Sequence, residues 1–212
     1  MTRAPLPLKE WILIPAVITL AITLIRLIGE LMNWSPALFS RAGGGAGAII
    51  GIVWLIPVLG VHFALKLRSI NERPESLGRG FGRVVLAIAL IPIAGLVASR
   101  VGINGTNAIV VVCLAFLGSI FVASPAWPAL ARVMWAYGLA ARIPVMLVML
   151  VAIFANWGTH YDVAPPGFPA VSPFVKWLLI GVFPQLTLWM GFTVVGGMLF
   201  GLITIAVSGK KA

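Results

Sequence analysis

Long apolar runs, separated by short segments that carry Lys and Arg, make up most of this 212-residue chain. Hydrophobic residues account for 61% of it and charged residues for 9%, whereas a typical soluble domain is about 25% charged. Such a composition leaves too few polar side chains to cover the surface of a soluble fold. The sequence therefore predicts an all-α protein, a polytopic integral membrane helix bundle.

Six apolar segments are candidates for spanning helices. A bilayer core about 30 Å thick needs about 20 apolar residues of helix, because lipid offers no partner for an unpaired backbone group. We predict a single transmembrane domain over residues 1–212, in which the fifth span is short unless it continues the stretch from Pro128. An interfacial piece at 174–183 is expected before the sixth. The predicted spans are 11–34, 45–65, 81–99, 106–124, 143–157 and 184–207.

The positions of the Lys and Arg residues predict the topology. Positive charge near the ends of short loops keeps those loops in the cytoplasm. We therefore place both termini in the cytoplasm, in a bacterial-type inner or plasma membrane, and interpret the net charge of +10 as topology and attraction to anionic headgroups rather than nucleic-acid binding. The cytoplasmic segments then hold Arg3, Lys9, Lys66, Arg68, Arg73, Arg79, Arg83, Arg132, Arg142, Lys210 and Lys211, and the outer loops hold Arg41, Arg100 and Lys176.

Arg26 and Glu30 are charged residues inside the first predicted span. A charge at that depth costs several kcal/mol and raises a functional question. Their spacing of four places both side chains on one helix face. Two interpretations stay open, a structural ion pair near the outer interface and a pair that lines a cavity.

The loop at residues 156–162, NWGTHYD, concentrates polar and aromatic side chains on the predicted outer side. One interpretation is an outer polar pocket; the other is an ordered interfacial turn closed by hydrogen bonds between His160 and Asp162. A metal bound by these two residues and Glu30 is a weaker alternative, and we expect none. The candidate pocket comprises Arg26, Glu30, Arg100, Asn156, His160, Asp162 and Gln185.

Glycines at a spacing of four predict close helix packing. Small residues at that spacing form a strip that another helix can approach. We expect packing within the chain rather than between subunits. The strips are Gly43, Gly47 and Gly51 at the start of the second span, and Gly197 and Gly201 in the sixth.

Two basic segments are expected at the cytoplasmic interface. Arg73, Arg79 and Arg83 predict contact with lipid headgroups, with an anion-binding nest at the neighbouring glycines as the alternative. Residues 128–142 are interpreted as an amphipathic interfacial helix, with Arg132 toward the headgroups and Met134, Trp135 and Tyr137 at the lipid boundary.

No catalytic arrangement is evident in the sequence. It shows no nucleophile and base pair, no pair of carboxylates and no cofactor motif, so we expect no enzyme activity and no cofactor. The most economical prediction is an accessory or scaffold subunit that packs against other membrane helices. A small transporter or channel with an outward-facing polar pocket is the alternative, disfavoured because the predicted midplane looks apolar. A membrane enzyme at the outer face is the least favoured.

Overall fold

The computed structural model describes residues 6–43, 49–165 and 167–209, and these form helices without strands. Five helical segments are long and apolar enough to cross a membrane, which indicates a multi-pass membrane protein. They are α1 (Leu8–Leu31), α3 (Leu77–Arg100), α4 (Gly105–Ala123) with the 3-10 turn that follows it (Ser124–Ala126), α5 (Pro128–Ala155), and the segment Pro173–Ser208, which ends in α7 (Met190–Ser208).

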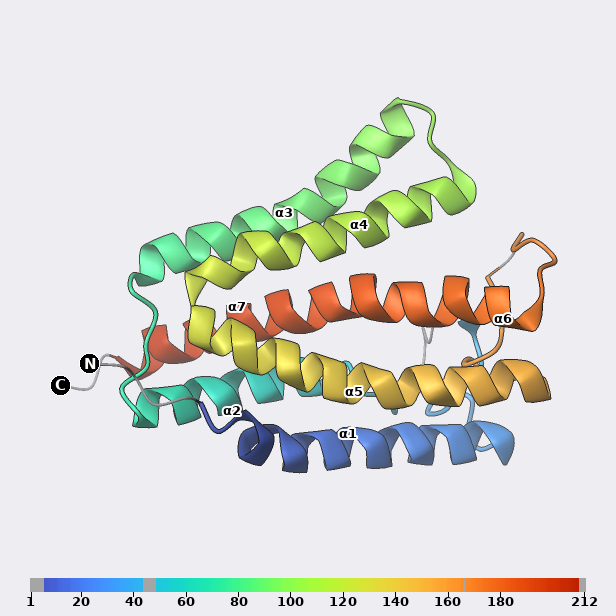
Figure 1. The fold of residues 1–212 in the computed structure, drawn as a ribbon, viewed down its shortest axis with the longest axis horizontal. Coiled ribbons are helices and arrows are strands. Elements are labelled where there is room, and N and C mark those ends of the chain that lie inside the picture. Colours follow the sequence, from blue (N-terminus) through green and yellow to red (C-terminus); the bar gives the residue numbers. More distant parts are fainter. Residues whose placement is uncertain (1–5, 44–48, 166, 210–212) are drawn as a thin grey trace.

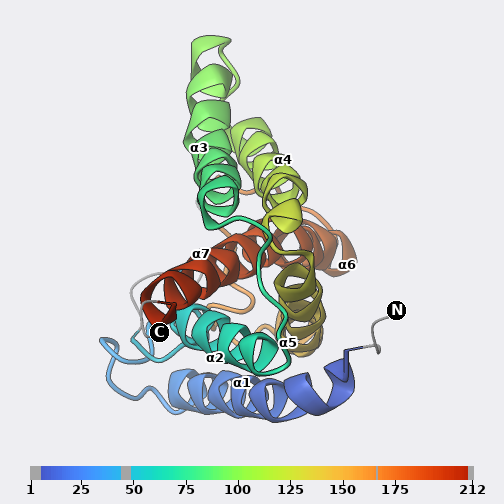
Figure 2. The same ribbon diagram turned by 90° about the vertical axis from the view of Figure 1, so that its left-hand side faces the viewer.

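The long helices run between the two ends of the molecule, successive ones in opposite senses (Figure 1), and they are tilted against one another (Figure 2). From one side of the bundle to the other the order is α1, then α2 (Leu55–Ser69) with α5, then α7, α4 and α3 (Figures 1 and 2). We call the end where α1 begins and α7 ends the terminal end, and the end where α1, α3 and α5 end the loop end. The turn between α2 and α3 lies at the terminal end. It is flanked by Lys66, Arg68, Arg73, Arg79 and Arg83, which belong to the segments predicted to be cytoplasmic.

The polarity of α1 is the reverse of that of a helix on a soluble protein. Its buried face carries Thr19, Thr23, Arg26 and Glu30, whereas large aliphatic side chains such as Ile14 are exposed. An exposed apolar face suits lipid, and a buried polar face needs partners on other helices. α1 finds one on α5, where the hydroxyls of Thr19 and Tyr137 lie 2.9 Å apart.

The second predicted span differs from the structure. We expected a helix from residue 45, but α2 begins at Leu55, and residues 49–54 form bends and turns. At 15 residues, α2 is about 22 Å long, so the expected count of six spans is not confirmed. The glycine-rich sequence before Leu55 explains the difference, because glycine is about 1 kcal/mol less favourable than alanine in a helix.

α5 corrects the interpretation of residues 128–142 as an interfacial helix. Pro128–Ala155 is one continuous helix that begins with proline at its first position, and Met134 and Tyr137 are buried in the core. Arg142 therefore does not belong with the cytoplasmic charges. It lies about 20 Å from either end of the helix.

The predicted interfacial piece at 174–183 also differs. Residues Pro173–Ser208 form one helical segment that passes through two π-helical turns, η3 (Trp177–Val182) and η4 (Gln185–Trp189), before α7. A π turn adds a residue to the helical repeat and redirects the side chains that follow it.

The glycines of the two predicted strips behave differently. Gly197 and Gly201 lie on α7 where a Cβ would meet Met134 and Leu130 of α5. Gly43 and Gly51 precede α2, so they do not form the helical strip that the spacing predicts, and Gly47 lies outside the described residues. One close approach of two helix backbones involves a glycine outside both strips. A Cβ on Gly60 of α2 would lie 2.6 Å from the carbonyl oxygen of Gly197.

We predict that Gly60→Ala lowers the melting temperature of the detergent-solubilised protein, because the new methyl group meets backbone atoms that cannot rotate away. The expected cost is about 1–3 kcal/mol, typical of overpacking. Gly82→Ala is the matched control, since a Cβ there has nothing within 4 Å and alanine favours the helix. If both variants melt at the wild-type temperature, the close approach of α2 and α7 is wrong.

Candidate functional site

The carboxylate of Glu30 is the centre of a buried cluster at the loop end. Its side chain is fully buried, and its Oε1 accepts a hydrogen bond of 2.8 Å from Nε of Arg26, one turn earlier on α1. The backbone N–H of His160 donates to Oε2 at 2.8 Å, and Nδ1 of the same residue contacts Oε1. Arg41 donates to the backbone carbonyl of Glu30. The carboxylate therefore holds α1 and a loop 130 residues away in one position.

His160 takes part as a neutral donor. Burial lowers the pKa of its imidazole more than the contact with Glu30 raises it, and the nearby Arg26 lowers it further. A carboxylate can only accept hydrogen bonds, so the proton of the neutral ring lies on Nδ1. The ionic partner of Glu30 is then Arg26, and His160 supplies two uncharged donors.

The loop that carries His160 is closed by Asp162. The Asp162 carboxylate accepts hydrogen bonds from the backbone of Gly158 at 2.9 Å and from the backbone and hydroxyl of Thr159, both at 2.7 Å. The hydroxyl of Tyr161 donates to the Thr23 carbonyl of α1 at 3.1 Å. The turn thus forms, but its geometry differs from the expected pairing of His160 with Asp162. Asp162 orders the loop, while His160 and Tyr161 fasten it to α1.

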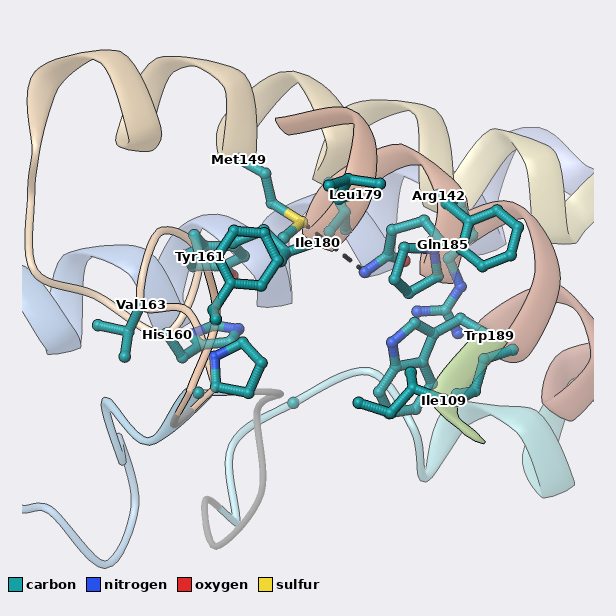
Figure 3. A pocket seen from close by; sticks show the side chains of 18 of the residues that line it. Ile109, Arg142, Met149, His160, Tyr161, Val163, Leu179, Ile180, Gln185 and Trp189 are labelled. Atoms are coloured by element: carbon teal, nitrogen blue, oxygen red, sulfur yellow. Dashed lines mark hydrogen bonds between the residues drawn. The ribbon is translucent and has the colours of Figure 1, made fainter. Parts of the chain in front are cut away.

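A cavity of about 580 Å³ lies beside this cluster (Figure 3). Its walls come from α1, α4, α5, the irregular residues before α2, the loop after α5 and the π-helical turns. Most of the lining is apolar. The polar side chains among it are few. His160 lies at one end and Arg142 and Gln185 at the other (Figure 3), and Arg26 lies near His160 because both contact Oε1 of Glu30. No Asp or Glu is among the described residues that line it.

Arg142 is the most unusual residue of the cavity. It is 4% exposed, in the middle of α5. Its Nη2 donates to the hydroxyl of Thr193 at 3.1 Å, and its guanidinium lies 5.3 Å from the centre of the Trp189 ring. Within the described part of the chain, its Nε has no hydrogen-bond partner.

Gln185, which also lines the cavity, carries a second buried atom without a partner. Its Oε1 is buried and, among the residues that the structure describes, lacks a hydrogen-bond partner. Its Nε2 faces only the sulfur of Met149 at 3.9 Å, a weak acceptor. Gln185 and Trp189 begin and end the π-helical turn η4, which brings both side chains to the cavity (Figure 3).

The structure brings together some of the residues that the sequence predicted for an outer pocket. Arg26, Glu30 and His160 are in contact, Asp162 orders the loop beside them, and Gln185 lines the cavity. Two others lie elsewhere. Arg100 is exposed at the end of α3, and Asn156 is the exposed C-terminal cap of α5, with a φ of 51°.

Sequence reasoning did not include Arg142, Trp189 and Thr193 among the site residues, and it placed Arg142 at the end of a span rather than in the middle of a helix. The signal was available in the length of the apolar run from Pro128. A single helix of 28 residues places Arg142 at its centre, where an ionisable residue is a candidate functional residue.

Arg73, Arg79 and Arg83 are all exposed at the terminal end, where a headgroup could reach them. Gly78, Gly80 and Gly82 belong to the regular helix α3 rather than to a separate glycine loop. Ser76 caps that helix by accepting a hydrogen bond from the backbone of Arg79.

Comparison of the chain with known protein families, with curated proteins and with solved structures finds no match. The function is therefore inferred from the chemistry of the site.

We predict strong energetic coupling between Glu30 and His160. In a double-mutant cycle with Glu30→Gln and His160→Ala, the coupling in unfolding free energy should exceed about 1 kcal/mol, as for buried groups in direct contact. The same cycle with Asp162→Asn in place of His160→Ala is the control. It should give less than about 0.5 kcal/mol, because the Asp162 carboxylate bonds to its own loop. Equal coupling in the two cycles would contradict this division of roles.

Proposed function

We propose that this protein is a small membrane transporter or ligand-binding protein that takes up a small molecule into the cavity from the loop end. The observation that carries the proposal is Arg142, a buried arginine in the middle of an apolar helix whose Nε faces no partner within the described residues. An ionisable side chain at such a depth is costly and is retained mostly where it lines a pathway or a site. A purely structural subunit has no need of it.

The size and lining of the cavity support binding. Ligand sites commonly enclose about 300–1,000 Å³, with mostly apolar walls and a few polar groups that fix the orientation of the ligand. The volume of the cavity, about 580 Å³, lies within this range. Polar side chains lie at each of its two ends, with His160 at one and Arg142 and Gln185 at the other.

Breaks in helical structure at the cavity support the proposal further. Non-helical backbone at membrane depth is tolerated where it lines a cavity, and transporters build their sites from interrupted helices. Two departures from regular α-helix meet here, the irregular residues 49–54 and the π-helical turns Trp177–Val182 and Gln185–Trp189. Gly51, Ile52 and Val53 from the first line the same cavity as Gln185 from the second.

The direction of access follows from the predicted topology. With both termini in the cytoplasm of an inner or plasma membrane, the loop end faces outward, and a ligand enters the cavity from outside. An accessory role that adds contacts with other membrane helices is compatible with this function and stays a prediction from the sequence. Nothing specific to the cavity favours an enzyme.

Accessibility of Val145 tests the proposal. Val145 lines the cavity one turn beyond Arg142 and is only 6% exposed, so a reagent reaches it through the cavity. In a Cys113→Ala background, Val145→Cys should react with a small membrane-impermeant thiol reagent added to intact cells. Val133→Cys, on the same helix but in the sealed core, should not react.

The side of the membrane from which the reagent reacts distinguishes a wrong topology from a wrong cavity. Reaction of Val145→Cys only in inverted vesicles would keep the cavity and reverse the topology. Absence of reaction from both sides would contradict an accessible cavity and therefore the proposed function.

A further inference from the structure

We propose that the ligand is a monoanionic amphiphile, with one carboxylate at Arg142 and Gln185 and an apolar body that extends toward the loop end. This inference rests on the proposed function, and it adds the chemical class of the molecule that the cavity takes.

The charge of the cavity points to an anion. Two arginines line it, and they differ in their surroundings. Arg26 is paired with the buried carboxylate of Glu30 at 2.8 Å. Arg142 contacts a hydroxyl and an aromatic ring, and no carboxylate is among the described lining residues. A bound anion would supply the opposite charge that a buried guanidinium otherwise lacks.

The number of charges points to a monoanion. A single guanidinium can balance one negative charge. A dianionic phosphate would need a second free cation, and the Arg26 charge is already balanced by Glu30. A cationic ligand would meet repulsion from Arg142 without a compensating carboxylate.

The geometry at Arg142 suits a carboxylate. Trp189 lies over the guanidinium and Thr193 accepts from Nη2, so the group is held in place, and its buried Nε has no hydrogen-bond partner among the described residues. A fixed arginine edge recognises planar carboxylates well. The amide of Gln185 can rotate about its last bond to present either oxygen or nitrogen, and it can therefore donate to the second carboxylate oxygen.

The rest of the cavity suits an apolar body. Val145 and Met149 follow Arg142 on the same face of α5, three and seven residues nearer the loop end. They extend an apolar wall for about 10 Å along the helix from Arg142. Ile180 and Ile52 line the same cavity, and Tyr161 lies at its other end (Figure 3). An alkyl or aryl chain attached to the carboxylate would lie along these side chains.

A pair of fluorescent probes tests the inference. The protein is placed in nanodiscs of phosphatidylcholine, and cis-parinaric acid and its methyl ester are titrated at alkaline pH, where the acid is ionised. Empty nanodiscs give the background from partition into lipid. The acid should bind at least about tenfold more tightly than the ester, as expected for a charge-assisted hydrogen bond in a buried site.

Variants locate the effect. Arg142→Gln should weaken binding of the acid by at least about tenfold and leave the ester unchanged. Arg132→Gln, an exposed arginine on the same helix, is the matched control and should bind like wild type. If circular dichroism and size-exclusion chromatography show that Arg142→Gln does not fold, binding to Arg142→Lys and Gln185→Leu tests the inference instead. The first should keep a preference for the acid, because it keeps the charge, and the second should reduce it.

The outcomes separate the inference from the function on which it rests. Equal binding of acid and ester, with no effect of either arginine variant, would overturn the anionic class while an accessible Val145→Cys keeps the cavity as a binding site. Tighter binding of a dianionic alkyl phosphate that depends on Arg142 would overturn the assignment of a single charge. If neither probe binds above background and Val145→Cys does not react, the proposed function fails as well.

Discussion

The loop end of the structure depends on the contacts of one buried carboxylate, that of Glu30, with Arg26 and His160. It joins Arg26 on its own helix to the loop after α5 through two donors of His160. A buried charge that loses its partner is costly, so the fold of the loop end depends on this contact. Tyr161 adds a second attachment at Thr23, two turns away on α1. The loop can therefore serve as a fixed wall of the cavity.

The irregular backbone of residues 49–54 and the π turns lie next to this wall, and their position has a physical reason. Lipid cannot satisfy free N–H and C=O groups, so an interrupted helix must lie against protein or a polar cavity. Residues 49–54 lie beside Arg26, where a Cβ on Gly51 would be 3.2 Å from Nη1. The π turns lie across the cavity and present Gln185 and Trp189 to it. The irregular residues 49–54, the π turns and the polar side chains therefore all lie at the cavity, where their polar groups do not face lipid.

Much of the bundle is readable from the sequence, because a run of apolar residues of sufficient length has few alternatives in a membrane. Residues 11–34, 81–99 and 106–124 agree with helices that are long and apolar enough to span. The pairing of Arg26 with Glu30 follows from their spacing. The contact of His160 with Glu30 could not be derived, because it depends on how α1 and α5 pack. The start of α2 and the two π turns depend equally on tertiary contacts, and periodicity alone does not reveal them.

The two arginines of the cavity differ in their partners, and this difference indicates a different role for each. Each is buried in an apolar helix, and each would be costly alone. Arg26 has its counter-charge one turn away in the same chain, so its burial is explained by folding. Arg142 has a hydroxyl and an indole, which orient the guanidinium without neutralising it. Under the function proposed above, a guanidinium with a fixed direction and an uncompensated charge suits a ligand that arrives from outside the chain.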